Sequence, residues 1–476
     1  IPIRKPDPMT IDLQAFTQSI NPGRSLQITS ESDRRLYIDF ASVRGGTAIQ
    51  KMHNRITRLS PDTPTCALFT GHIGCGKSTE LMRLQAQLEK DGFFVVYFES
   101  SEDLELADVD IVDVLLVIAR RITESLGKLQ VQEPKGFKRL IHQAANLLQT
   151  EIYLTGKAKL PGVGTIAAST EGTIAVETVL GSISASMEDG ISISADIGEI
   201  TLSAKNDSRL RQRLNQFLGP QKTELLRLIN VELIEPAIVQ LKKQGQKGLV
   251  VIVDNLDRID NRIKTFAKPQ DEYLFVDQGD ILNKLNCHLV YTMPLALRFS
   301  NEYGNLLQRF ARPQVLPMVL IKHRDGRLCE EAIELLKQMV LSRAFPDLSE
   351  ADRLGRVTEI FDEPESLDYL CRMSGGHVRD LLRLLLEWVE EEMDLPLTRN
   401  TLEDVLINVA SEMKLRISEQ EWAQLRQVKT TQMVSDEVGY DELIRSRMVF
   451  EYQEGKESWF GVNPLLAHAP QLQLTT

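Results

Sequence analysis

The chain has 476 residues, of which 42% are hydrophobic and 26% charged, and its formal net charge is −12. This composition is that of an ordinary soluble globular protein with roughly two to four domains, and the acidic balance argues against a dedicated nucleic-acid binder. The five cysteines are widely spaced without a C-x-x-C pair, which argues against a disulfide framework or a zinc site. Because no apolar run reaches the length of a membrane helix and no signal-peptide core opens the chain, we expect a cytoplasmic protein.

The N-terminal residues 1–35 are rich in proline, serine and charge, and we expect them to form an irregular arm. A helix is predicted over 47–59, and an apolar run over 66–70 predicts a buried strand. That strand leads directly into the strongest motif of the chain, Gly71-His72-Ile73-Gly74-Cys75-Gly76-Lys77-Ser78-Thr79.

This segment matches the phosphate-binding loop pattern G-x-x-x-x-G-K-[S/T], and a helix pattern follows it, as the motif requires. The glycines let backbone N–H groups turn toward a phosphate, and the helix N-terminus adds partial positive charge. We expect Lys77 to reach the β- and γ-phosphates of a nucleotide and the Ser78 hydroxyl to ligate Mg²⁺. Tyr37 and Phe40, ahead of the loop, are candidates for contact with the base; as an alternative, they are simply core residues.

Beyond the loop, the chain alternates between predicted helices and buried strands. A strand is expected over 93–98, a long amphipathic helix within 104–126 and another helix over 136–148. From 157 to 205 the composition shifts to Gly, Ser, Thr, Ala and Ile, with glycines recurring every eight or nine residues. This pattern predicts a β-rich insertion of short strands, which could be a decorative sheet, an oligomerisation element or a membrane-inserting hairpin.

Three strands are predicted in the second half, over 249–253, 287–292 and 315–320. The first ends in Asp254-Asn255-Leu256-Asp257-Arg258, a Walker B pattern whose first aspartate would hold Mg²⁺ through water. The second ends at Thr292, where a hydroxyl could sense the γ-phosphate. Strands separated by helices predict an α/β fold with a five-stranded parallel sheet.

The C-terminal part is predicted to be helical from about residue 327. Two glycines precede a strongly amphipathic helix that carries Arg379, which suggests a lid. A helix and a hairpin near the end suit a small winged-helix-like domain whose wing is an interaction or regulatory surface. The domains we expect are the arm (1–35), the first core part (36–156), the β-rich insertion (157–205), the second core part (206–325), the helical lid (326–396) and the winged-helix-like domain (397–476).

With these motifs in this order, the chain resembles the AAA+ and STAND superfamily of P-loop ATPases over roughly residues 36–390, with some KAP- and NACHT-like features at Walker B. The resemblance implies that Thr292 is a sensor, that Arg379 reaches the γ-phosphate and that Arg309 or Arg312 acts in trans as an arginine finger. Many AAA+ motors have a catalytic glutamate where this chain has Asn255, and an amide cannot accept the proton. Either Asp257 substitutes for it or hydrolysis is slow, and we favour slow hydrolysis.

The resemblance therefore implies an ATP-binding, Mg²⁺-dependent molecular switch that assembles into a homo-oligomer. In bacteria such proteins commonly serve signalling or antiviral defence, and the protein partner or trigger is not identified by any residue. Two alternatives stay open: a motor that remodels nucleic acid or protein, and a membrane-acting assembly that uses the insertion.

Overall fold

The computed structural model describes residues 11–127, 134–155, 193–264, 268–434 and 439–473. At its centre lies a five-stranded parallel sheet with the strand order β2-β3-β4-β1-β5. The strands are β1 (Cys66–Thr70), β2 (Phe94–Glu99), β3 (Leu249–Asp254), β4 (His288–Thr292) and β5 (Gln314–Val315). The predicted α/β class and the five-stranded parallel sheet are thus confirmed.

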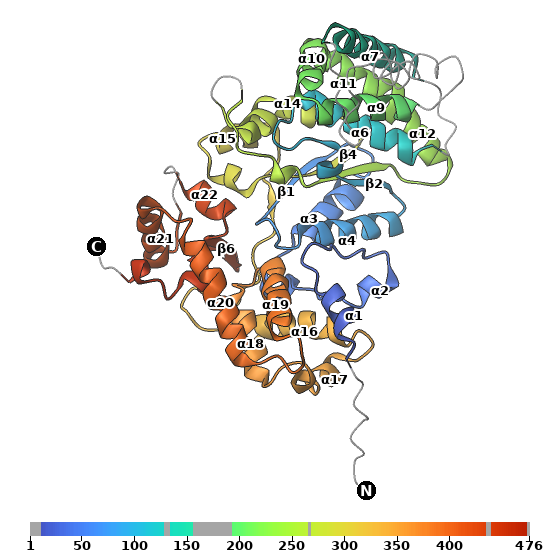
Figure 1. Ribbon diagram of the computed structural model, residues 1–476. Coiled ribbons are helices and arrows are strands. Elements are labelled where there is room, and N and C mark those ends of the chain that lie inside the picture. The colour runs from blue at the N-terminus through green and yellow to red at the C-terminus, as the bar shows by residue number, and fades with distance from the viewer. Residues whose placement is uncertain (1–10, 128–133, 156–192, 265–267, 435–438, 474–476) are drawn as a thin grey trace, which may run out of the picture.

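Successive residues of the central strands point to opposite faces of the sheet, and all of them are buried in β3 and β4 because both faces are covered. On one face Val251 and Val253 pack under a layer of helices, seen at the top of Figure 1. That side of the sheet carries α5 (Ser100–Asp103), α6 (Ile111–Ser125), α7 (Lys135–Thr155), α9 (Ile193–Asn206), α10 (Ser208–Leu218), α11 (Lys222–Leu228), α12 (Glu235–Lys243), α13 (Gln270–Glu272), α14 (Gly279–Leu282) and α15 (Tyr303–Arg309). No helix in the described ranges is long and apolar enough to cross a membrane.

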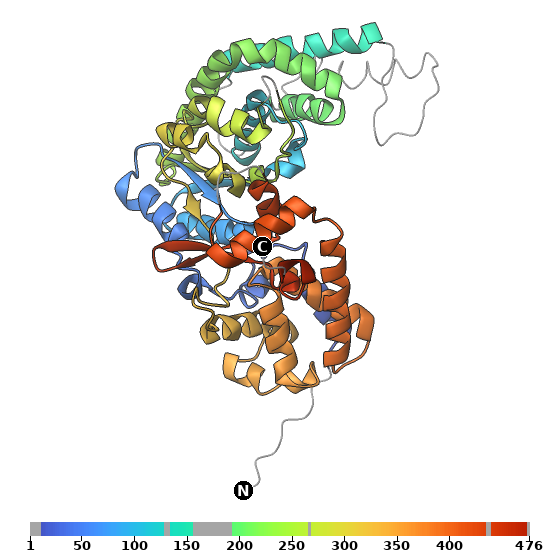
Figure 2. The same cartoon turned by 90° about the vertical axis from the view of Figure 1, so that its left-hand side faces the viewer.

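The other face of the sheet, with Val250 and Ile252, packs against α3 (Ala48–Asn54), α4 (Lys77–Lys90) and a C-terminal hairpin. Beyond it lies a helical lid of α16 (Glu330–Ala344), α17 (Glu350–Leu354), α18 (Pro364–Met373) and α19 (Val378–Glu392). The C-terminal domain contains α20 (Arg399–Lys414), α21 (Glu419–Thr431), α22 (Tyr440–Arg445), β6 (Val449–Glu454) and β7 (Glu457–Val462). The helices α21 and α22 share a core with the hairpin, so the winged-helix-like fold is confirmed for them, whereas the buried residues of α20, such as Leu402 and Leu406, pack in the core of the lid. Figure 2 shows lid and C-terminal domain on the side away from α7 and α10.

The predicted β-rich insertion is wrong over residues 193–205, which form the helix α9. Ile197 and Ile200 are fully buried in the core shared with α6, and Ala204 continues this face one turn later. The same isoleucines that suggest alternation also recur at helical spacing, and tertiary burial selects the helix. Residues 157–192, with most of the glycine repeats, lie outside the described residues.

The arm is not irregular where it is described, because it contains α1 (Leu13–Ser19) and α2 (Glu31–Arg34). Asp12 caps α1 by accepting a hydrogen bond from the N–H of Ala15. Phe16 and Ile20 then bury one face of the chain in the core of the lid. The arm is therefore anchored to the lid.

The last strand of the sheet is shorter than the predicted run over 315–320, because β5 ends at Val315. Pro317 has no N–H to offer the sheet. The N–H of Met318 donates instead to Glu451 on β6. This segment therefore joins the central sheet to the C-terminal hairpin.

Candidate functional site

The phosphate-binding loop lies between β1 and α4, as its sequence predicts. Gly74 and Gly76 adopt φ values of 92° and 104°, a region that L-residues with a side chain avoid. A Cβ at Gly74 would lie 2.7 Å from Cε1 of His377. The loop is therefore shaped by its glycines and is in close contact with the lid.

Lys77, the first residue of α4, points back into the loop. Its Nζ donates to the carbonyl oxygens of Gly71 and His72, at 2.8 Å each, and lies 2.9 Å from Oδ2 of Asp257. Burial lowers the pKa of Lys77, but Asp257, Cys75 and Asp254 together raise it more, so the ammonium form is maintained. Since Asp257 Oδ1 has no partner within the described chain, this oxygen can still accept a hydrogen bond from a ligand.

Asp254 lies at the end of β3 and is almost fully buried. The hydroxyl of Tyr97 donates to its Oδ2 at 2.9 Å. Burial and the nearby Asp257 raise the pKa of Asp254, whereas the hydroxyls of Ser78 and Tyr97 lower it. Two buried carboxylates beside a hydroxyl are hard oxygen donors that a cation would stabilise, so the residues present fit Mg²⁺. Among the described residues no group of three or more His, Cys, Asp or Glu forms a metal cluster, so Mg²⁺ would also need phosphate and water oxygens.

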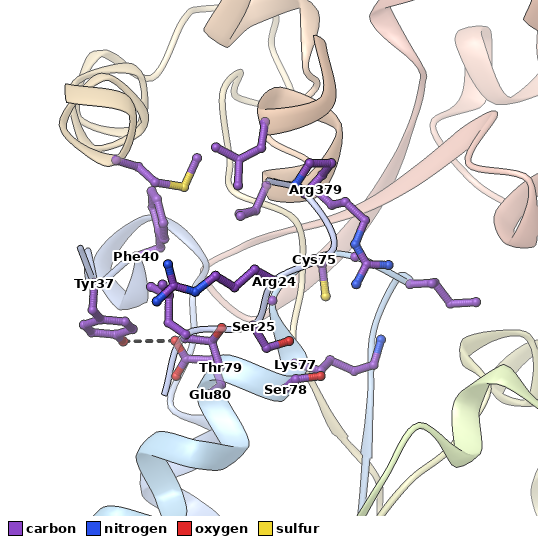
Figure 3. Close-up of a pocket in the computed structure, with 18 of the residues that line it drawn as sticks. Arg24, Ser25, Tyr37, Phe40, Cys75, Lys77, Ser78, Thr79, Glu80 and Arg379 are labelled. Carbon is purple, nitrogen blue, oxygen red and sulfur yellow. Dashed lines mark hydrogen bonds between the residues drawn. The ribbon is translucent and has the colours of Figure 1, made fainter. Parts of the chain in front are cut away.

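A cavity opens beside this loop and is lined by residues of the arm, the loop, the end of β3 and the lid. In Figure 3 Tyr37 and Phe40 lie at one end and Lys77 at the other. The Tyr37 hydroxyl donates to Oε1 of Glu80 at 3.0 Å. The apolar end is completed by the side chains of Leu26, Leu36, Ile38, Met339 and Leu382. The cavity thus has an apolar end and a phosphate end.

Several arginines line the cavity. Arg44 donates to the carbonyl oxygen of Cys75 at 2.8 Å. Arg379, on the lid, forms no ion pair within the described chain, and burial together with Arg258 lowers its pKa. This concentration of positive charge suits a polyanionic ligand. Five arginines line the cavity in all, and the sequence analysis missed Arg24, Arg44 and Arg343, because only the fold brings them to it.

Three predicted residues are not brought to the cavity. Thr292 is buried at the end of β4 between β1 and β3, and its hydroxyl has no partner among the described residues. Arg309 lies 3.6 Å from Asp280, and Arg312 is exposed near Arg55 on another side of the domain. Within one copy of the chain, neither arginine lines the cavity.

The lid and the C-terminal hairpin both bond directly to the phosphate-binding loop. His377 Nε2 donates to the carbonyl of Ile73 at 2.8 Å, and the N–H of Glu451 donates to Nε2 of His72 at 2.8 Å. Phe450 stacks on His377 and meets the edge of His72. Burial lowers the pKa of both histidines, so they are held neutral. The loop is therefore the meeting point of three domains.

No protein-family model matches the chain. No curated protein matches it. Fifteen solved chains match it in structure. One is the ORC1 protein of Aeropyrum pernix in complex with DNA, at 12% identity over 88% of this chain and 91% of that one, with a TM-score of 0.33. The ORC2 protein of Aeropyrum pernix with ADPNP and ADP has 11% identity, coverages of 89% and 90%, and a TM-score of 0.36. CDC6P from Pyrobaculum aerophilum has 11% identity, coverages of 97% and 97%, and a TM-score of 0.34. Because these three TM-scores lie below 0.5, we base the function on this chain's own site.

Proposed function

We propose that the chain binds ATP with Mg²⁺ in this cavity and acts as a slowly hydrolysing, nucleotide-dependent switch of the AAA+ and STAND type. The observation that carries this proposal is that the lid and the C-terminal hairpin are bonded to the loop that would hold the phosphates. A ligand that reshapes the loop therefore changes the contacts of both domains.

The triphosphate would occupy the positive end of the cavity and the base its apolar end. Lys77 would exchange the two loop carbonyls for phosphate oxygens, while Arg379 approaches from the lid. Ser78 and Asp254 would hold Mg²⁺, which neutralises phosphate charge when bound. Tyr37 and Phe40 would contact the base at the far end.

Two sets of hydrogen bonds couple the phosphate-binding loop to the lid and to the C-terminal hairpin. On the lid side, Ile73 and Gly74 bond to His377 and to the N–H of Arg379. On the hairpin side, His72 bonds to β6, and Tyr452 donates to the carbonyl of Gly375 at the start of the lid helix. Exchange or hydrolysis of the nucleotide would change both sets of hydrogen bonds together. The lid and the hairpin would then be released for self-assembly. Arg309 or Arg312 would then complete the site of a second copy. Such a switch suits signalling or antiviral defence.

The test is the mass of the full chain in solution, by light scattering after size exclusion, with ATP–Mg²⁺, with ADP and without nucleotide. We expect an oligomer only with ATP–Mg²⁺, and its loss in Lys77→Ala. Hydrogen exchange of residues 449–454 on β6 should respond to ATP in the wild type and not in this variant. A monomer in every state, with unchanged exchange on β6, would contradict the proposal.

The insertion can be tested in the same experiment. Because α9 packs on α6, a deletion must end before Ile193 to leave the core intact. Removal of 160–190 that abolishes the ATP-dependent oligomer would assign assembly to the insertion, whereas an unchanged oligomer would exclude that role.

A further inference from the structure

The end of β2 places an additional carboxylate beside the Walker B aspartate. Strands β2 and β3 are parallel neighbours, and their register pairs Glu99 with Asp254. The carboxyl ends of parallel strands lie at the same edge of a sheet, where ligands bind in open α/β folds. Glu99 therefore lies at the edge that carries the phosphate-binding loop and the proposed Mg²⁺ ligands; it does not itself line the cavity but is bonded to Asn255, which does.

Asn255 holds this glutamate in place. Its Nδ2 donates to Oε2 of Glu99 at 2.6 Å and to Oγ of Ser101 at 3.2 Å, and its N–H donates to Asp254. Within the described chain, Asn255 is the only side chain that donates to Glu99, so the second carboxylate oxygen is left for another donor.

The backbone explains why position 255 carries an amide. Asn255 has φ of 64°, a left-handed conformation that asparagine tolerates better than most residues with a side chain. A glutamate there would be strained. Asp257, the other candidate from the sequence, has one carboxylate oxygen committed to the ion pair with Lys77.

We propose that Glu99 is the catalytic base of ATP hydrolysis in this chain and that Asn255 positions it, an inference that rests on the proposed binding of ATP. Glu99 would take a proton from water as the water oxygen bonds to the γ-phosphorus. The bond from that phosphorus to the bridging oxygen then breaks, and its electron pair leaves with ADP. The proton later passes from Glu99 to solvent. The switch would thus reset itself despite Asn255.

The test compares Glu99→Gln with Glu102→Gln, a matched change at a carboxylate three residues away that is exposed and paired with Arg121. The glutamine keeps an acceptor for Asn255, so the fold should persist. We expect kcat for ATP to fall by about 100-fold or more in Glu99→Gln, the range of general base catalysis, with the Kd for ATP unchanged. Glu102→Gln should behave as wild type.

A second measurement does not depend on turnover. Affinity for ADP with aluminium fluoride, which mimics the transferring phosphoryl group, should fall in Glu99→Gln while affinity for ADP alone stays constant. Asn255→Gly keeps the left-handed backbone and removes the donor, so it should lower kcat without changing the Kd for ATP.

The outcomes separate the two proposals. A wild-type chain that fails to bind ATP overturns the proposed function and this inference together. ATP binding without hydrolysis in the wild type, or wild-type kcat in Glu99→Gln, overturns only the role of Glu99. If Glu99→Gln does not fold, wild-type kcat in Asn255→Gly overturns the positioning contact on which the inference depends.

Discussion

The two ends of the cavity are built in different ways. The phosphate end comes from the continuous segment 71–79, whose shape depends on its own backbone, and from strand ends of the rigid sheet. The apolar end is assembled from the arm and two lid helices, with Leu26, Met339 and Leu382 far apart in the sequence. The first end should survive movement of the lid, whereas the second exists only while arm and lid are docked. A substitution at one end should therefore weaken phosphate binding or base recognition without affecting the other.

The largest effect is expected at the phosphate end, from Lys77→Met combined with Asp257→Asn. Removing both members of the buried pair avoids leaving an unpaired charge, which typically costs about 3–5 kcal/mol. We expect the affinities for ATP and for inorganic tripolyphosphate to fall together, by about 100-fold, since charge-assisted bonds to phosphate are lost in both. Calorimetric titration measures both ligands, and Arg372→Gln, away from the cavity lining, is the control. Unchanged binding of tripolyphosphate would show that the loop does not hold the phosphates.

His377 joins the lid to the phosphate-binding loop, and it should make the stability of the protein depend on pH. Burial, partly offset by Asp380 and reinforced by Arg447, lowers the pKa of His377 to about 4, against 6.5 in an unfolded chain. Above pH 6.5 the ring is neutral in both states; between pH 6.5 and 4 only the unfolded chain takes up the proton, so the free energy of unfolding falls. The full loss is about 3 kcal/mol.

Chemical denaturation at a series of pH values measures this loss. His377→Asn should reduce the slope of that part of the profile, because its own titration is gone while that of His72, whose pKa burial also lowers, remains. His468→Asn, at an exposed histidine, should leave the profile unchanged. A profile that keeps its full slope in His377→Asn would assign the acid sensitivity to other groups.

A smaller effect is expected where the lid reaches the phosphate end. Arg379 lines the cavity without an ion pair in the described chain, so its charge is available to a ligand. Arg379→Gln should weaken ATP by about tenfold and ADP much less, since one charge-assisted hydrogen bond to the γ-phosphate is lost. Arg372→Gln, on the neighbouring lid helix and away from the cavity lining, is the control. Equal losses for ATP and ADP would contradict contact with the γ-phosphate.

The same contrast explains what the sequence could predict. The phosphate-binding loop and Asp254 were predicted because their patterns are local and depend on backbone geometry. Lys77 was predicted to meet a phosphate, but its pairing with Asp257 needed the order of the strands. Glu99 follows a predicted strand, yet only the adjacency of β2 and β3 makes it a catalytic candidate. Strand order is set by packing across the whole domain.

The apolar end was predicted only at Tyr37 and Phe40, the part nearest the loop in sequence. Arg343 and Met339 come from a lid helix whose own pattern indicates only a helix. The error over 193–205 has a related cause, because small residues with scattered isoleucines fit strand and helix periods alike. In each case, contacts between residues that are far apart in the sequence decide the structure.

The sharpest test of the apolar end is Tyr37→Ala, for which a loss of about tenfold in ATP affinity is expected from the value of base–aromatic contacts, about 1–3 kcal/mol. Tripolyphosphate affinity should stay unchanged, since the ring is at the end away from Lys77. Tyr37→Phe keeps the ring and loses only the bond to Glu80, so ATP should bind nearly as in the wild type. Tyr369→Ala is a matched control, because Tyr369 also lies under an arginine but outside the cavity lining. Parallel losses of ATP and tripolyphosphate in Tyr37→Ala would mean that the two ends form a single unit, and the comparison between them would fail.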